Sequence, residues 1–383
     1  MGDISDRDPN RVYYNSGGFQ RSRPILTGPE AKETFEEIPV IDFSEVTSSA
    51  TDVRQRLADE VGHAARNVGF FYVKNAPVSH TKIDRAFELL ESFFAQPEDA
   101  KRQIDCNKSN EAKGWQPQQT VGPNGVLRES YSMGNDYKEP EQHHISVAPE
   151  GSVPLNQWPS EDTIPGFRKA IYDYYLEVYP FAKTLIQIFS LALGLDQTEL
   201  DQYFQQPLAD ITAQYYPAHQ APDSNPLELL SPHADFGVVT LLLQNDVPGL
   251  EVLNANGIWI PAPPMPYTFV VNTGNYVEAW TNGRWPATVH RVYGKLDQPR
   301  FSLPFFVSPS PDVVVKPLRE LLEDGERPKY EERNVGQRQV KGQIGSRHNH
   351  PMTKLLRRVV PQEEDWRWEM LYQPHLLPRV ASS

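Results

Sequence analysis

The sequence predicts an α+β fold in which helices come first and a β-sandwich or jelly roll follows. Two segments near the N-terminus, 51–69 and 80–97, have apolar residues at helical spacing, and so does the longer segment 164–195. From about residue 210 to residue 315, short β-branched and aromatic segments follow one another closely. Such closely spaced short strands are typical of sandwiches and jelly rolls.

The N-terminal third of the chain is predicted to alternate between strands and helices. Residues 1–36 are polar and rich in glycine and proline, so we expect an extended N-terminal arm. The segments 38–43 (IPVIDF) and 70–75 (FFYVKN) are short and apolar, which predicts two strands. The helix between them should be capped by Thr51 or Asp52, and a glycine at its end should stop it.

The middle of the chain contains an irregular segment and then the longest helical pattern. Residues 105–160 contain many turn-forming residues, so we expect mostly loops there. A long irregular segment is either plain surface or a region that covers a substrate. In the helix that follows, Pro180 should kink or divide the helical pattern, because proline lacks a backbone N–H.

Two Asn-Gly pairs lie between alternating segments of the strand-rich region. We interpret Asn256-Gly257 and Asn282-Gly283 as type I′ hairpin turns. After the strands the chain becomes polar, and 351–360 (PMTKLLRRVV) has the pattern of a helix.

We therefore divide the chain into four parts. They are the N-terminal arm (1–36), an α/β region with substrate-side loops (37–160), the long helix with the jelly-roll core (161–315), and a C-terminal extension that is a candidate lid (316–383).

Charge and composition narrow the possible partners. The 383-residue chain has a net charge of −13, which argues against nucleic acid or an anionic membrane as its partner. Cys106 is the single cysteine, so no intrachain disulfide can form. The charged N-terminus lacks the apolar region of a secretory signal, and no run is long enough for a transmembrane helix. We expect a soluble, cytoplasmic protein.

The segment 231–244 (SPHADFGVVTLLLQ) contains the first candidate for chemistry. The apolar run VVTLLL predicts a buried strand, and residues two apart on a strand share one face. His233 and Asp235 would then point the same way, which favours a metal site. A strand with a polar entrance would give the same pattern.

His290 supplies the third member of a possible metal site. It lies in TVHRVYG, on another predicted strand. Two histidines and one carboxylate leave about three octahedral positions open, which is the facial arrangement of non-haem Fe(II) oxygenases. Oxygen and a second ligand that supplies electrons both need such open positions, whereas a zinc hydrolase usually keeps one.

A candidate carboxylate-binding pair follows the third histidine. Arg300 and Ser302, in PRFSLPFFVS, lie two apart on a predicted strand, and a guanidinium with a hydroxyl is suited to holding a carboxylate. Tyr216, in AQYYP, could donate a further hydrogen bond. Alone, such a pair is more often a chance surface feature, and its position directly after the third histidine favours a binding role.

The order H-x-D, H-R-V, R-x-S resembles the isopenicillin N synthase-like group of Fe(II)/2-oxoglutarate-dependent dioxygenases. Further stretches match that family over roughly residues 37–315: IPVIDF, GFFYVKN, YYP, VPGLEV, GIWIPA, VVNTGN and WTNGRW. The resemblance implies a double-stranded β-helix (jelly-roll) core flanked by N-terminal helices. It also implies Fe(II), 2-oxoglutarate and O2 as cofactor and cosubstrates.

The resemblance assigns a role to each candidate residue of the metal site. By position, His233, Asp235 and His290 match the iron ligands. Arg300 and Ser302 match the pair that holds the distal carboxylate of 2-oxoglutarate.

Four more positions take their roles from the resemblance. Tyr216 matches a tyrosine that reaches the cosubstrate or the substrate. Val292 and Phe306 would line the substrate side of the pocket, although ordinary barrel core would explain them equally well. Where plant relatives often carry asparagine, this chain has Gln214, so the outer hydrogen bonds to the cosubstrate differ.

Three functions stay open at this point. The first is a 2-oxoglutarate-dependent dioxygenase that hydroxylates, desaturates or closes a ring in a small organic molecule of secondary metabolism. The second is an oxidase like isopenicillin N synthase, whose RxSLPFFV string this chain nearly repeats and which uses no 2-oxoglutarate. The third is a non-catalytic jelly-roll binding protein or a zinc-bound relative.

Overall fold

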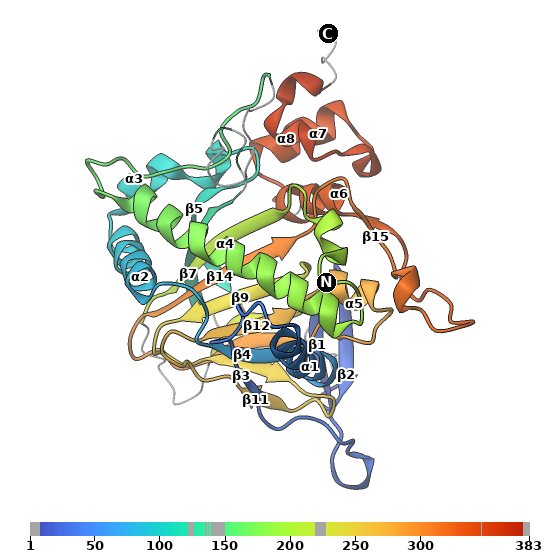
Figure 1. Cartoon of the computed structure of the whole chain (residues 1–383). Coiled ribbons are helices and arrows are strands. Elements are labelled where there is room, and N and C mark those ends of the chain that lie inside the picture. Colours follow the sequence, from blue (N-terminus) through green and yellow to red (C-terminus); the bar gives the residue numbers. More distant parts are fainter. Residues whose placement is uncertain are drawn as a thin grey trace.

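Two β-sheets packed face to face form the core of the computed structural model (Figure 1). The structure describes residues 8–121, 126–134, 136, 138, 150–218, 227–345 and 347–377. The eight-stranded sheet has the order β3 (Val40–Asp42), β4 (Phe70–Lys74), β12 (Phe269–Thr273), β9 (Val239–Gln244), β14 (Arg300–Ser308), β7 (Leu208–Tyr216), β6 (Val126–Met133), β5 (Gly114–Val121). The six-stranded sheet has the order β11 (Trp259–Pro261), β10 (Leu250–Leu253), β13 (His290–Gly294), β8 (Leu227–His233), β1 (Arg11–Ser16), β2 (Phe19–Pro24).

Apolar side chains from both sheets meet between them. Phe70 and Val270 of the larger sheet pack in one cluster with Leu250 and Val252 of the smaller sheet. The predicted α+β fold with a jelly-roll core is therefore confirmed. The four-part division of the chain stays a prediction, and strands from both sides of residue 160 share the larger sheet.

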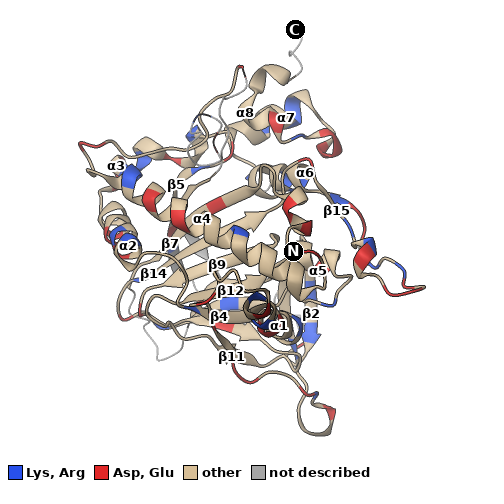
Figure 2. Cartoon of the chain, viewed as in Figure 1, with Lys and Arg blue, Asp and Glu red and all other residues tan. Residues whose placement is uncertain are grey.

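The helices lie outside the sheets. They are α1 (Thr51–Asn67), α2 (His80–Phe94), α3 (Glu98–Lys101), α4 (Phe167–Ala192), α5 (Asn275–Trp280), α6 (Val335–Gln339), α7 (Pro351–Val359) and α8 (Glu369–Tyr372). No helix in the described part of the chain is long and apolar enough to cross a membrane. In this view, basic and acidic residues are both scattered over the helices and loops (Figure 2).

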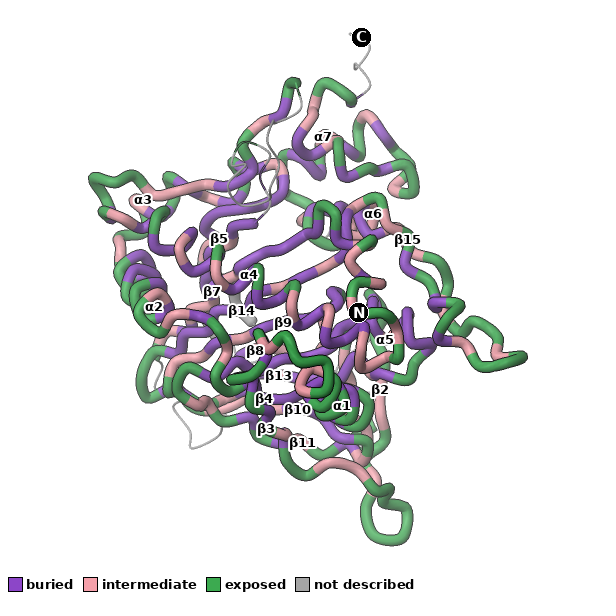
Figure 3. Tube along the Cα trace, in the orientation of Figure 1, coloured by how far each residue is buried: buried purple, intermediate pink, exposed green. Residues whose placement is uncertain are grey.

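The long helix α4 lies across the outer face of the larger sheet (Figure 1). Its Tyr175 and Phe181 rings contact Phe305 of β14 and Phe269 of β12, with ring centroids 5.4 and 5.8 Å apart. Pro180 does not divide the helix, which is continuous through it. The central strands of the larger sheet and the sheet-facing sides of the helices are buried, while the edge strand β2 and the outer sides of the helices are largely exposed (Figure 3).

The predicted start and end of the first helix are confirmed, but its predicted capping residue is wrong. Thr51 already lies within α1, and the N-cap residue is Ala50, which offers no side-chain cap. Gly69, two residues after the helix, has φ +73°, a left-handed conformation that favours glycine.

The N-terminal arm is not simply extended, because residues 11–24 form a β-hairpin. Gly17 and Gly18, both with positive φ, make its two-residue turn. The first strand then pairs in parallel with β8, where Asn15 lies opposite His233. The arm thus completes the smaller sheet at its outer edge.

Residues 105–160 are also less irregular than predicted, because β5 and β6 extend the larger sheet through β7. The sequence did not predict β6 as a strand, because its side chains do not alternate between apolar and polar. Its core-facing side includes Glu129, which is buried and pairs with Lys101 at 2.7 Å. Its other side carries Ser130 and Ser132, which face a cavity.

One of the two predicted turns is wrong and the other is of a different type. Asn282 and Gly283 have positive φ but follow helix α5, so residues 275–280 are not a strand. A hairpin does join β10 to β11, as predicted. However, Gly257 has positive φ while Asn256 does not, so its turn is not type I′.

The C-terminal extension packs around the same end of the molecule as β5 (Figure 1). Its strand β16 (Arg333–Asn334) pairs with β15 (Val314–Val315), which lies just before it. It also contains a π-helix (Val340–Gly345) and the helix α7, which confirms the predicted helix. Trp366 and Trp368 anchor the extension by burying their rings.

Candidate metal centre and adjoining cavities

His233, Asp235 and His290 converge at the open ends of two neighbouring strands. His233 is the last residue of β8 and His290 is the first of β13, and the two are direct partners across the strand pair. Asp235 lies in the connection between β8 and β9, where its carbonyl accepts a 2.8 Å hydrogen bond from the N–H of Asn275. The expectation that His233 and Asp235 share a strand is wrong, because the apolar strand begins only at Val239.

The three side chains direct one atom each toward a common point. Oδ1 of Asp235 lies 3.6 Å from Nε2 of His233 and 3.8 Å from Nε2 of His290. All three candidate ligand atoms lie within 4.8 Å of one another. Two imidazole nitrogens and one carboxylate oxygen at these separations fit one borderline metal ion such as Fe(II).

Hydrogen bonds on the side away from the candidate metal position fix the orientation of each of these side chains. Nδ1 of His233 is 2.9 Å from the carbonyl of Ser231, and Nδ1 of His290 is 3.3 Å from that of Thr288. A carbonyl only accepts, so each Nδ1 carries the proton and each Nε2 keeps its lone pair for a metal.

The carboxylate of Asp235 is fixed in the same way. Its Oδ2 accepts a 2.6 Å hydrogen bond from Oγ1 of Thr240 and a 2.9 Å hydrogen bond from Nδ2 of Asn272. Oδ1 is thereby left facing the two histidines. Such outer partners orient ligands and tune their affinity for a metal.

Burial and neighbouring charges set the protonation of the centre. Burial alone would raise the pKa of Asp235, but the histidines and the hydrogen bonds from Thr240 and Asn272 together lower it. Burial, together with His233, lowers the pKa of His290 to about 4. A carboxylate and a neutral imidazole are the forms that bind a cation without first releasing a proton.

An inner cavity of about 70 Å³ extends from this centre between the two sheets. Arg300 and Ser302 line it together with Tyr216 and the three candidate ligands. The Arg300 side chain is only 1% exposed, and its Nη2 donates a 2.6 Å hydrogen bond to Oε1 of Gln244. The sequence brings these side chains together because β14 pairs with β7 and β9 on either side.

Arg300 is a buried cation whose polar partners are neutral. Within the described ranges no carboxylate forms an ion pair with it, and its buried Nε has no hydrogen-bond partner. Burial lowers the pKa of Arg300, while Tyr216, whose ring centroid is 5.5 Å from Cζ, opposes this. A buried unpaired cation is costly, so an anionic ligand in the inner cavity would satisfy it.

The two residues predicted for the substrate side lie in different places. Phe306 lines both the inner cavity and a larger outer one, next to the metal centre. Val292 lines only the inner cavity, where it packs with Tyr216. Val292 therefore belongs with the residues around Arg300, because β13 directs it between the sheets rather than toward the outer cavity.

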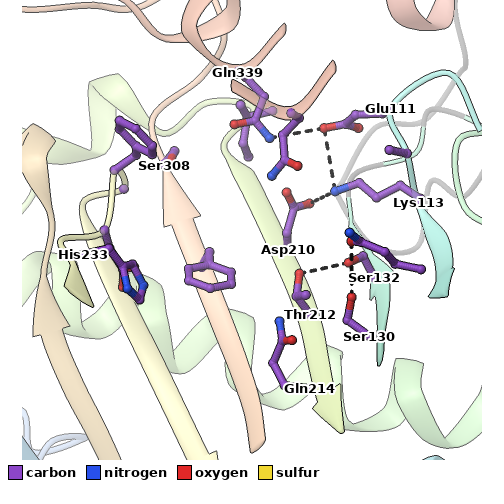
Figure 4. A pocket seen from close by; sticks show the side chains of 18 of the residues that line it. Glu111, Lys113, Ser130, Ser132, Asp210, Thr212, Gln214, His233, Ser308 and Gln339 are labelled. Carbon is purple, nitrogen blue, oxygen red and sulfur yellow. Dashed lines mark hydrogen bonds and ion pairs between the residues drawn. The ribbon is translucent and has the colours of Figure 1, made fainter. Parts of the chain in front are cut away.

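The outer cavity has a volume of about 360 Å³ and a polar wall. Figure 4 shows His233 on one side and the side chains of β7 and β6 on the other. The two cavities share His233 and Asp235, together with Gln214 and Phe306. A molecule in the outer cavity and one in the inner cavity would therefore both reach the metal centre.

Several residues of the site were not identified as functional from the sequence. Gln244 ends an apolar strand, and Thr240 and Asn272 lie in strands that we interpreted only as core. The polar wall of the outer cavity comes partly from the β5–β6 hairpin, which we predicted to be loop. A polar residue inside an apolar strand is the one sign that could have identified Thr240.

Two family models match the chain. Residues 38–161 match the N-terminal model described as non-haem dioxygenase in morphine synthesis, and residues 209–309 match the 2OG-Fe(II) oxygenase superfamily. All five predicted metal-site and carboxylate-binding residues lie within the second match.

Similar curated proteins carry the same description. The 2-oxoglutarate-Fe(II) type oxidoreductase ppzC of Metarhizium rileyi is 31% identical and covers 83% of this chain and 89% of its own length. The oxidoreductase hxnY of Emericella nidulans, of the same type, is 31% identical over 76% of this chain and 85% of its own.

Solved structures agree on the fold. A full-length Neurospora crassa protein in complex with alpha-KG and 5-formyluracil has a TM-score of 0.70 at 24% identity, covering 82% of this chain and 98% of its own. JOX2 in complex with 2OG, Fe and JA has a TM-score of 0.62 at 25% identity, covering 81% and 86%. The chain belongs to the 2-oxoglutarate-Fe(II) oxygenase superfamily and is a dioxygenase that uses Fe(II), 2-oxoglutarate and O2.

Proposed function

We propose that His233, Asp235 and His290 hold the Fe(II) ion and that Arg300 and Ser302 bind the distal carboxylate of 2-oxoglutarate. The observation that carries this assignment is the buried guanidinium of Arg300, which has neutral partners and shares a cavity with the three candidate ligands. A dicarboxylate whose other end reaches the metal would satisfy both groups at once.

When bound, Fe(II) would supply the oxidative chemistry. In that reaction 2-oxoglutarate and O2 are consumed, a C–H bond of the substrate is oxidised, and succinate and CO2 are released. The chain supplies position and shelter. Ser302 and Tyr216 flank the guanidinium, and Phe70 packs edge-on against His290 with ring centroids 5.3 Å apart. The rings of Tyr216 and Phe70 would limit the access of water to the inner cavity.

The substrate is a small organic molecule, which we place in the outer cavity. We propose a role in secondary metabolism in the cytoplasm, with hydroxylation, desaturation or ring formation as the outcome. Relatives named as fungal 2-oxoglutarate-Fe(II) oxidoreductases and the 2-oxoglutarate-dependent dioxygenase htyE of Aspergillus rugulosus support this setting. They also favour a 2-oxoglutarate-dependent reaction over the oxidase alternative.

An anaerobic titration tests the assignment. Protein loaded with Fe(II) should develop a weak visible charge-transfer band when 2-oxoglutarate is added, and should form succinate when O2 is admitted. His233→Ala should lose the band and the succinate, whereas the exposed His348→Ala should keep both. Full succinate formation by His233→Ala would refute the metal assignment, and Fe(II) binding without the band would refute the role of Arg300.

A further inference from the structure

Three ionisable side chains lie buried at the far end of the outer cavity from His233 (Figure 4). Glu111, Lys113 and Asp210 are 2%, 3% and 8% exposed. Nζ of Lys113 lies 2.7 Å from Oδ1 of Asp210 and 3.7 Å from Oε1 of Glu111. Burying charge is expensive, so such a cluster needs a reason to be there.

The backbone is shaped to hold this charged cluster. Ala112 and Gly114 both have positive φ, and they flank Lys113 where the chain enters β5. On the other side, a Cβ added to Gly134 would overlap Oδ1 of Asp210. The cluster is therefore closely packed against main chain rather than formed by long side chains meeting in solvent.

The hydrogen bonds of the cluster are incomplete on the acceptor side. It contains two carboxyl groups and one ammonium group, and Oε2 of Glu111 is buried without a hydrogen-bond partner. Oε1 of Gln214, on the same wall, is also buried without a partner. Among the described residues that line the outer cavity, these are the buried side-chain atoms without a partner, and both are oxygens that accept hydrogen bonds, Oε2 of Glu111 when its carboxyl is ionised.

Two arginines, Arg128 and Arg347, line the outer cavity, and neither donates to these two oxygens. Arg347, which also lines the cavity, donates to Oε1 of Gln116 and to the carbonyl of Gln343. In the inner cavity, which Gln214 also lines, the buried Nε of Arg300 is a donor without a partner. A donor without a partner suits an anionic ligand, and acceptors without partners suit a ligand with N–H groups.

The wall between the metal centre and the cluster sets the size of that ligand. Asp210, Thr212 and Gln214 alternate along β7 and face the cavity, as Phe306 does on β14. Strands lie about 4.8 Å apart, so β14 and β6 are separated by about 10 Å across β7. A molecule of one or two rings spans this distance.

We infer that Glu111, Asp210 and Gln214 form the specificity-determining wall of the outer cavity and bind N–H groups of the substrate. The enzyme then selects a nitrogen-bearing small molecule, an amine or an amide, whose other end reaches the metal centre. This inference rests on the proposed function, since it takes the outer cavity as the substrate site. A purely structural ion pair between Lys113 and Asp210 would not require Glu111 beside it with an unpartnered oxygen.

Matched pairs of bicyclic probes test this inference. In each pair an oxygen replaces the N–H group: 2-quinolone against coumarin for an amide, and tetrahydroisoquinoline against isochroman for an amine. Binding to the full chain, loaded anaerobically with Fe(II) and 2-oxoglutarate, is measured by calorimetry or ligand-observed NMR. We expect at least one N–H probe to bind about tenfold or more tightly than its oxygen counterpart.

Two variants of Glu111 assign the preference to the wall. Glu111→Met removes both acceptor oxygens and should bring the affinity ratio close to one. Above about pH 8, where Glu111 is ionised, Glu111→Gln should keep a preference for the amide and lose a preference for the amine. Below that pH, where Glu111 carries its own proton, Glu111→Gln should keep the wild-type preference. Lys113 keeps its 2.7 Å partner Asp210 in both variants, which favours folding.

A matched control is Glu278→Met. Burial raises the pKa of Glu278 as it does that of Glu111, but Glu278 lies on α5 and lines neither cavity. This control should keep the wild-type affinity ratio. The charge-transfer band of each loaded protein is recorded separately, so loss of 2-oxoglutarate binding is distinguished from loss of selectivity.

Three outcomes would overturn the inference. They are equal affinities within both pairs in the wild type, no saturable binding of either N–H probe, and an unchanged ratio in Glu111→Met. If the band is present in those experiments, the proposed function survives and only the role of the wall is refuted.

Discussion

Arg300 donates its short 2.6 Å hydrogen bond to the neutral amide oxygen of Gln244, which lies on the neighbouring strand β9. A carboxylate at that position would neutralise the guanidinium within the protein. The amide instead orients the guanidinium and leaves its charge available to an anion. Because its partner is neutral, Arg300 can bind an anionic ligand instead of forming an ion pair within the protein.

Replacing Gln244 by glutamate should therefore weaken 2-oxoglutarate binding. The new carboxylate would pair with Arg300, and we expect the dissociation constant for 2-oxoglutarate to rise about 10- to 100-fold, the loss of one charge-assisted contact. Anaerobic titration of the Fe(II)-loaded protein measures it. The exposed Gln205→Glu adds the same charge elsewhere and should leave the constant unchanged. Unaltered affinity in Gln244→Glu would place the anion somewhere other than Arg300.

The hydrogen bonds behind Asp235 should control metal affinity. Thr240→Val keeps the shape of the side chain and removes the donor 2.6 Å from Oδ2. We expect Fe(II) to bind about 10- to 100-fold more weakly, as is usual when a ligand loses its outer partner. Equilibrium dialysis against Fe(II) measures this. In the control Thr184→Val the lost hydroxyl bonds only to the carbonyl of Pro180, and wild-type Fe(II) affinity is expected.

Glu111 should make the stability of the protein depend on pH. Burial raises its pKa to about 8, and Asp210 and Asp136 add to this while Lys113 and Gln339 oppose it. Between the ordinary carboxyl pKa and pH 8 the folded state holds a proton that the unfolded state releases, so stability falls as the pH rises. The slope from this one group approaches about 1.4 kcal/mol per pH unit.

Urea unfolding of the wild type and Glu111→Gln measures that slope. The neutral amide cannot titrate, so the variant should lose stability less steeply between about pH 5 and pH 8. Parallel curves for the two proteins across this window would show that Glu111 keeps its ordinary pKa.

Gly134 should tolerate no side chain, although its backbone conformation suits any residue. In Gly134→Ala the new Cβ would overlap Oδ1 of Asp210 and lie 2.9 Å from Nζ of Lys113. We expect a loss of about 1–3 kcal/mol in the free energy of unfolding, the usual cost of overpacking. Gly342→Ala is the matched control, since nothing lies within 4 Å of its Cβ. Equal stability of the two variants would mean that the cluster rearranges freely.

The sequence predicted the residues of the site better than the backbone that carries them. His233, Asp235 and His290 follow from the chemistry of metal ligands and from their order, and the structure brings all three within 4.8 Å. The common strand face that we expected does not exist, because Asp235 lies in a connection. Spacing of two residues is compatible with a strand or with a bend, and the sequence alone does not separate them.

Most of the strands that were not predicted from the sequence have polar residues where an apolar face was expected. Strand prediction relies on alternating apolar residues, and β6 has serines on one face and the buried Glu129 among the residues of the other. The hairpin at residues 11–24 is similarly polar. For α5, the aromatic and β-branched residues Tyr276, Val277 and Trp280 favoured a strand, but tertiary packing buries them on a short helix.

The parallel pairing of Asn15 with His233 ties the start of the chain to the metal centre. The carbonyl of Asn15 accepts a 2.9 Å hydrogen bond from the N–H of Ala234, between the two predicted ligands. Fraying of the first hairpin would therefore loosen a ligand without any change to the ligand itself. Conversely, occupancy of the centre by Fe(II) would slow amide hydrogen exchange at Ala234, so that the terminal hairpin and the metal share one local unfolding equilibrium.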